Sequence, residues 1–357
     1  MDGLRFYAAL LVFMTHCLGT IRTALLSYPP VPAVDAGLIS RSLYFFADGN
    51  HGVDIFFVLS GYLMGVKFFG SRGNFSYGRF IQGRFSRIYP AFLASYLVVM
   101  VCNMHFGWAW SFNSFIAGLF FLNAVPALDV IPYHYVSWSI GFEFLFYLVF
   151  PALLFLPARF SSFTKATIAV VIVYAVTFSV PELTWLLRMT GLFLGLWIAS
   201  LDRNMLQKIA DRVPLWVGLA VYAAYLLSRG SLPYPVAYSL MLPGIALIFI
   251  SSVFGSNWLN RLFSTEPLRF LGTISYSFYL WHTMGISIGT FILLPFFGVP
   301  RTDTALTIAL MLPLTFCLSV LMAFVSFKLF EASYFRKRLQ IALPLSPEAA
   351  EPLALRR

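Results

Sequence analysis

The sequence has little charge, few acidic residues and very few cysteines. Only 11% of its 357 residues are charged, whereas 60% are hydrophobic and the mean hydropathy is +0.82. A typical soluble domain carries about 25% charged residues. A water-soluble protein could not hide so much apolar surface, so the composition excludes a soluble globular enzyme.

Cysteine patterns and several catalytic motifs are also missing. Cys17, Cys102 and Cys317 lie in apolar segments, are odd in number and show no paired spacing, so we expect neither a disulfide framework nor a metal site. The chain has no Walker phosphate-binding loop, no HExxH and no GxSxG. Nucleotide-loop and serine-hydrolase chemistry are therefore unsupported.

What the sequence has instead is a series of apolar stretches near the roughly 20 residues that a membrane-spanning helix needs. They predict an all-α protein, a polytopic transmembrane helical bundle of about ten spanning helices. The predicted spans are 4–27, 51–70, 89–106, 136–156, 164–180, 182–200, 214–229, 234–255, 271–295 and 304–328. A shorter apolar piece at 112–124 is re-entrant, interfacial or a further span.

Basic residues in short loops predict the orientation. Segment 71–90 holds four arginines and no acid, and the loops near 157–165, 201–213 and 256–270 are also basic. The positive-inside rule places these loops and both termini in the cytoplasm. It also explains the net charge of +10 without a nucleic-acid partner. We expect one transmembrane domain over 1–340, surrounded by membrane lipid, and a flexible cytoplasmic tail over 341–357.

Ionisable side chains inside the predicted spans are the main functional candidates. Inserting a central Asp, Lys or Arg costs roughly 2.5–3.5 kcal/mol, so such groups face protein or a wet cavity. The set consists of Arg5, His16, Asp54, Glu143, Arg188 and His282.

Arg5 and His16 share one helix face, because 11 residues make about three turns and roughly 16 Å. We expect Arg5 at the cytoplasmic surface and His16 near mid-membrane. A neutral imidazole titrates near neutral pH and suits proton abstraction. A structural hydrogen bond to a neighbouring helix is the equally weighted alternative.

The other buried candidates also have structural alternatives. Asp54 begins the second span, where a negative charge stabilises a helix N-terminus. Glu143 lies in an aromatic helix and needs an arginine, a histidine or water as its partner, so a buried ion pair is as plausible as catalysis. His282, deep in the ninth span, fits packing or acceptor lining better than a second catalytic base.

Arg84 and Arg87 are three residues apart and share a helix face. Two guanidinium groups at a cytoplasmic boundary suit phosphate binding, although simple positive-inside topology explains them too. Pro90, which follows them, suggests a turn or the start of a helix.

Taken in order, these segments resemble the acyltransferase-3 family of bacterial membrane acyltransferases. The resemblance is carried by MDGLRFYAALLVFMTH, GVDIFFVLSGYLM, RFSRIYP, SWSIGFEFLFYLVFP, LGTISYSFYLWH and FKLFEASYFRKRL. The family's arginine–histidine motif falls on Arg5 and His16, and its RxxR motif on Arg84 and Arg87. Its tryptophan–serine–glutamate motif falls on Trp138, Ser139 and Glu143.

The resemblance implies an O-acyltransferase in the bacterial inner membrane. Such an enzyme moves an acyl group, usually acetyl, from cytoplasmic acyl-CoA to a hydroxyl of an exported or cell-surface glycan. On this hypothesis Arg84 and Arg87, helped by Arg5 or Arg79, hold the phosphates of acetyl-CoA. The alternative is a glycan or lipid transporter without acyl transfer, because carriers also bury ionisable residues.

The same resemblance implies that His16 takes the proton of the acceptor hydroxyl. Glu143 or Asp54 would fix the tautomer of the imidazole, as the carboxylate does in a catalytic triad. An acyl-histidine intermediate is the alternative chemical route.

Overall fold

The computed structural model describes residues 1–20, 51–71, 75–105, 107, 109–228, 232–293, 296 and 304–336. Within these ranges the chain is helical and contains no β-strand, which confirms the predicted all-α class. The predicted tail at 341–357, and residues 21–27 of the first predicted span, lie outside the described residues.

The α-helices follow the apolar stretches of the sequence. They are α1 (Asp2–Thr20), α3 (His51–Gly70), α4 (Tyr77–His105), α5 (Phe112–Leu119), α6 (Trp138–Val149), α7 (Ser162–Ser179), α8 (Thr190–Ala199), α9 (Arg203–Arg212), α10 (Leu215–Ser228), α11 (Tyr234–Phe254), α12 (Trp258–Phe263), α13 (Glu266–Thr273), α14 (Ser275–Ile288) and α16 (Thr304–Ser326).

Shorter turns extend or connect these helices. The 3₁₀ turns are η2 (Leu122–Ala124), η3 (Pro126–Leu128), η4 (Tyr135–Ser137), η5 (Phe150–Phe155) and η6 (Pro181–Met189). The π-helical turns are η7 (Gly289–Leu293) and η8 (Phe327–Glu331), which follow α14 and α16.

Among the described residues, eight helical segments are long and apolar enough to cross a membrane, or nine if one bent pair counts as a span. The predicted ten spans are thus largely, but not fully, matched. The predicted span 214–229 corresponds to α10, which qualifies only together with α9 after a bend of 80°. Pro214 lies at this bend, and a proline cannot continue the hydrogen bonding of the preceding helix.

The predicted span 271–295 is interrupted near its start. The Ser275 hydroxyl donates to the Gly272 carbonyl at 2.7 Å, which competes with helical hydrogen bonding where α13 ends.

Two further expectations change. Segment 112–124 forms only the eight-residue α5 and turns, too short to cross as one helix. Pro90 does not start a helix but lies inside α4, as bilayer helices tolerate.

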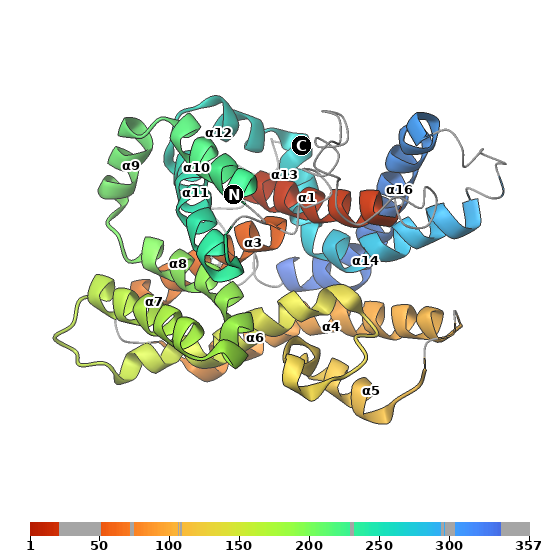
Figure 1. The fold of residues 1–357 in the computed structure, drawn as a ribbon, viewed down its shortest axis with the longest axis horizontal. Coiled ribbons are helices and arrows are strands. Elements are labelled where there is room, and N and C mark those ends of the chain that lie inside the picture. The colour runs from red at the N-terminus through yellow and green to blue at the C-terminus, as the bar shows by residue number, and fades with distance from the viewer. Residues whose placement is uncertain are drawn as a thin grey trace, which may run out of the picture.

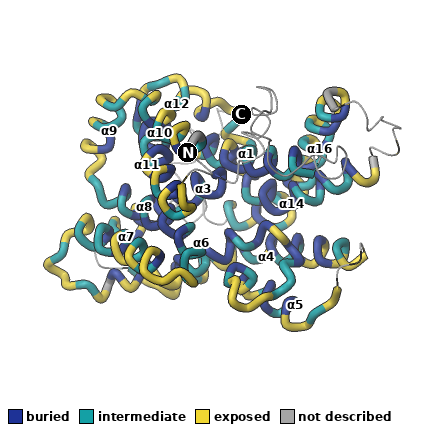
Figure 2. The backbone as a smooth tube through the Cα atoms, viewed as in Figure 1, coloured by how far each residue is buried: buried dark blue, intermediate teal, exposed yellow. Residues whose placement is uncertain are grey.

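The functional candidates lie on the central helices. α1 packs against α3, α13 and α14, and α4 runs alongside α14 (Figure 1). Figure 2 shows buried residues concentrated on α1, α3 and α14, and exposed residues on the peripheral α7 and α9. The polar side chains that the sequence places on α1, α3 and α14 are therefore held in protein surroundings.

Helices α3 and α8 approach each other backbone to backbone. Each has two glycines four residues apart, in GYLMG (61–65) and GLFLG (191–195). A Cβ on Gly61 would lie 1.9 Å from the Leu192 carbonyl oxygen, and one on Gly195 would lie 2.0 Å from that of Val58. Small residues at this spacing let membrane helices pack backbone against backbone.

Replacing Gly61 by alanine should therefore push α3 and α8 apart and destabilise the protein by about 1–3 kcal/mol, as overpacking does. Thermal unfolding in detergent, followed by tryptophan fluorescence, measures the effect. Gly70→Ala is the control on the same helix, because a Cβ there meets nothing within 4 Å. Equal midpoints for the two variants would contradict the proposed contact.

Candidate functional site

A cavity of about 110 Å³ lies among α1, α3, α4, α6 and α14. Its α3 wall runs from Val53 to Met64, roughly 16 Å along the helix axis. The polar residues of its lining are Arg5, Ser60, Arg84, Arg87, Ser139, Glu143, Tyr147, Ser275, Tyr276 and Tyr279. The rest of the lining is apolar, so the cavity suits a slender organic group with an anionic end.

Three of the four predicted phosphate-binding arginines line this cavity. Arg5 comes from α1, and Arg84 and Arg87 come from α4. Arg79 is exposed and does not line it. The structure thus brings together Arg5 and the RxxR pair and leaves Arg79 outside.

Aromatic rings hold two of these guanidinium groups in place. Arg84 lies 5.6 Å from the ring centre of Phe80 and 5.7 Å from that of Tyr147, while Arg87 lies 5.3 Å from that of Phe335. Such stacking orients a guanidinium and leaves its N–H groups available for an anion. Arg5 donates to Asp2 at 2.6 Å, which fixes its side chain at the start of α1.

Glu143 lines the cavity from α6. Its Oε1 atom accepts hydrogen bonds from the hydroxyls of Ser60 and Tyr147. The sequence predicted an arginine, a histidine or water as the partner of Glu143, and the partners that the structure shows for Oε1 are two hydroxyls. The carboxylate therefore connects α3 and α6 within the cavity wall.

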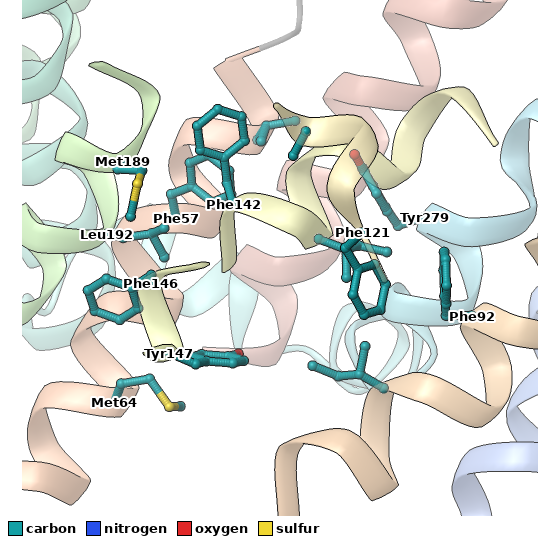
Figure 3. Close-up of a cluster of buried hydrophobic side chains, with 14 of the residues drawn as sticks. Phe57, Met64, Phe92, Phe121, Phe142, Phe146, Tyr147, Met189, Leu192 and Tyr279 are labelled. Carbon is teal, nitrogen blue, oxygen red and sulfur yellow. The ribbon is translucent and has the colours of Figure 1, made fainter. Parts of the chain in front are cut away.

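Tyr279 lines the cavity from α14, on the helix that also carries His282. Its hydroxyl donates to the Val136 carbonyl at 3.0 Å and lies 2.7 Å from the hydroxyl of Ser139. Figure 3 shows the Tyr279 oxygen directed toward the segment before α6. These bonds fix the turn of α14 that precedes His282.

His16 and His282 form a direct pair. The Nδ1 atom of His16 lies 2.7 Å from Nε2 of His282, and the two rings are coplanar within 2°. The Nδ1 atom of His282 lies 2.7 Å from the carbonyl oxygen of Tyr279. His282 is fully buried, whereas His16 is partly exposed and has the edge of Tyr135 beside it.

Asp54 belongs to a different cluster. Its fully buried carboxylate accepts from the Tyr238 hydroxyl at 2.6 Å and from Arg188 at 3.4 Å, and His51 lies 3.8 Å away. Arg188 also lies 5.3 Å from the ring centre of Trp138. The carboxylate thus joins α3, η6 and α11 in an ion-paired network.

The expected carboxylate partner of His16 needs correction. The structure brings neither Glu143 nor Asp54 to His16, because each is held by hydroxyl or guanidinium groups on other helices. The side chain that orients His16 is His282.

Comparison with known proteins identifies the family. A family model described as an acyltransferase domain matches residues 1–324. The chain belongs to the acyltransferase-3 family. Family membership and the apolar helices together make it a membrane-embedded acyltransferase.

Its relatives in the acyltransferase-3 family are distant but cover most of the chain. The exopolysaccharide production protein ExoZ of Rhizobium meliloti is 28% identical over 253 residues, which make up 68% of this chain and 78% of ExoZ. The acyltransferase MdmB of Streptomyces mycarofaciens is 26% identical over 320 residues, covering 81% and 79% of the two chains.

A further acyltransferase-3 relative is the peptidoglycan O-acetyltransferase OatA of Listeria monocytogenes. It is 26% identical over 323 residues, which cover 75% of this chain and 51% of OatA. No solved structure matches the chain.

The sequence analysis missed part of the acyltransferase-3 site. The end of the last helical segment supports the RxxR turn, since the Tyr334 hydroxyl donates to the Gly83 carbonyl at 3.0 Å and Phe335 stacks on Arg87. The segment FKLFEASYFRKRL supported the resemblance but had no assigned role. Its aromatic residues, next to the basic run at 336–338, were the available signal.

Proposed function

We propose that the protein is a bacterial inner-membrane O-acyltransferase that moves an acyl group, preferably acetyl, from cytoplasmic acyl-CoA to a hydroxyl of an exported or cell-surface glycan. The observation that carries this proposal is the cavity itself. Arg5, Arg84 and Arg87 line it, and it reaches Tyr279, one helical turn from His282. Relatives named for peptidoglycan O-acetylation and exopolysaccharide production support this acceptor class.

The arginines belong to the donor side of the proposed reaction. With both termini in the cytoplasm, Arg84 and Arg87 meet CoA at the inner boundary. Guanidinium groups bind phosphate oxygens through paired, charge-assisted hydrogen bonds. The apolar remainder of the cavity accepts the slender arm that carries the thioester.

The histidine belongs to the acceptor side. His16 takes the proton of the acceptor hydroxyl while the oxygen attacks the thioester carbonyl. The carbon–sulfur bond then breaks, and the CoA thiolate takes up the proton from His16. The products are the glycan ester and free CoA.

Acetyl transfer tests this proposal directly. Membranes containing the protein are given radiolabelled acetyl-CoA. The label incorporated into surface glycan is counted, and the free CoA that is released is assayed separately. We expect glycan labelling with one CoA released per acetyl group, both absent from membranes without the protein. A transporter would move glycan without consuming acetyl-CoA, and that result would overturn the proposal.

Removing Arg84 or Arg87 should weaken CoA binding by about 10- to 100-fold, because hydrogen bonds to charged groups contribute about 1.5–3 kcal/mol. Calorimetric titration of CoA into the purified Arg84→Ala and Arg87→Ala variants measures the loss. Arg159→Ala removes an exposed arginine away from the cavity and should bind CoA as the wild type does. Unchanged affinity in both cavity variants would refute the phosphate-binding role.

A further inference from the structure

The hydrogen bond between His282 and Tyr279 has only one possible direction. The partner of His282 Nδ1 is a backbone carbonyl oxygen, 2.7 Å away, and a carbonyl oxygen only accepts. Nδ1 of His282 must therefore carry a hydrogen. In a neutral imidazole the other nitrogen is then an acceptor, so Nε2 of His282 presents a lone pair.

This direction determines the tautomer of His16. Nε2 of His282 lies 2.7 Å from Nδ1 of His16, so Nδ1 of His16 must be the donor. Its Nε2 atom then holds the free lone pair. The protonation state of one ring nitrogen is generally set by the hydrogen bond of the other. Here the Tyr279 carbonyl sets the tautomer of His282 and, through it, the tautomer of His16.

We propose that His282 is the positioning residue for His16 and that Nε2 of His16 is the atom that accepts the proton. The tautomer assignment stands on the hydrogen bonds alone, whereas its catalytic consequence rests on the proposed function. His282 thereby takes the role that a carboxylate fills in a catalytic triad.

Burial and ring geometry make His282 suitable for this role. Its ring is fully buried and both its nitrogens are engaged, so it cannot turn without losing a hydrogen bond. The ring of Phe278 stacks beside it at 6.3 Å. Coplanarity within 2° directs the lone pair of His282 along the N–H bond of His16.

The pair also stabilises the positive charge that develops on His16 in the proposed step. When Nε2 of His16 takes the hydroxyl proton, the ring becomes an imidazolium and its Nδ1–H bond to His282 becomes charge-assisted. Such bonds are shorter and about twice as strong as neutral ones. When the imidazolium returns the proton to the CoA thiolate, both rings recover their starting tautomers.

Two conservative substitutions separate positioning from packing. In His282→Gln the amide oxygen can occupy the place of Nε2 and accept from His16. In His282→Asn the amide nitrogen can occupy the place of Nδ1 and donate to Tyr279, but no acceptor reaches His16. We expect His282→Asn to lose at least about 100-fold in kcat with the KM for acetyl-CoA unchanged, a loss in the range for general base catalysis.

The glutamine variant provides the rescue. We expect His282→Gln to keep kcat within about tenfold of the wild type, because the acceptor for His16 Nδ1–H is retained. Wild-type kcat in the asparagine variant, or equal losses in both variants with CoA affinity intact, would overturn the proposal.

Nuclear magnetic resonance of ring-¹⁵N-labelled histidine tests the tautomers without any acceptor. The chain has only five histidines, so signals can be assigned by comparing wild type with His16→Ala and His282→Gln. We expect hydrogen on Nδ1 of both His16 and His282. Hydrogen on Nε2 of His16 would overturn the assignment even if acetyl transfer is confirmed, whereas absent acetyl transfer would overturn only the proposed function.

Discussion

Replacing His16 by alanine is expected to lower kcat for acetyl transfer by at least about 100-fold, the lower range of a positioned general base. CoA affinity should stay within about twofold, because a group that acts in the transition state contributes little to ground-state binding. The arginines proposed to bind phosphate lie at the other end of α1 and on α4, so the variant leaves them in place.

Single-turnover kinetics with acetyl-CoA and calorimetric binding of CoA measure the two quantities separately. His105→Ala is the matched control, since His105 is exposed at the end of α4. It should retain full activity. A folded His16→Ala variant with normal kcat would remove His16 from the reaction.

Replacing Asp54 by asparagine is expected to lower the free energy of unfolding by about 3–5 kcal/mol, the usual cost of removing one partner of a buried ion pair. The change leaves Arg188 without its anion inside the helical bundle and replaces the charged acceptor of Tyr238. The midpoint of thermal unfolding in detergent reports the loss.

Asp129→Asn is the matched control for this stability prediction. Asp129 is exposed, and its φ of 44° lies in the left-handed region that asparagine also adopts. Its midpoint should match that of the wild type. The double variant Asp54→Leu/Arg188→Met should recover much of the loss, because no charge is then left unpaired. Equal midpoints for Asp54→Asn and wild type would show that the ion pair is not structural.

The fold class could be predicted because a chain of this composition cannot place most of its side chains in water. The lengths of the apolar stretches located most helices, but they could not show where a helix breaks. Those breaks depend on Pro214 and on the Ser275 hydroxyl bonding to Gly272, which are local hydrogen-bonding effects inside otherwise apolar sequence. Within the described residues, length and hydropathy therefore missed the bend between α9 and α10 and the break between α13 and α14.

The site was predictable where its residues share a helix or a motif. Helical periodicity placed Arg84 and Arg87 on one face, and both line the cavity. The partner of His16 was not predictable in this way, because His282 is 266 residues away and the two meet only through packing of α1 on α14. The sequence showed that Asp54 and Arg188 were costly to bury, but not that they pair.

The contact between α3 and α8 also bears on how the cavity can widen. Gly61 lets α3 contact the backbone of α8, while Phe57, Ser60 and Met64 on a neighbouring face of α3 form one side of the cavity. That side is backed by the close backbone contact with α8. Widening the cavity for a bulky donor therefore requires displacement of α1, α4, α6 or α14. On the proposed function, the rates of CoA entry and release then depend on the mobility of these helices.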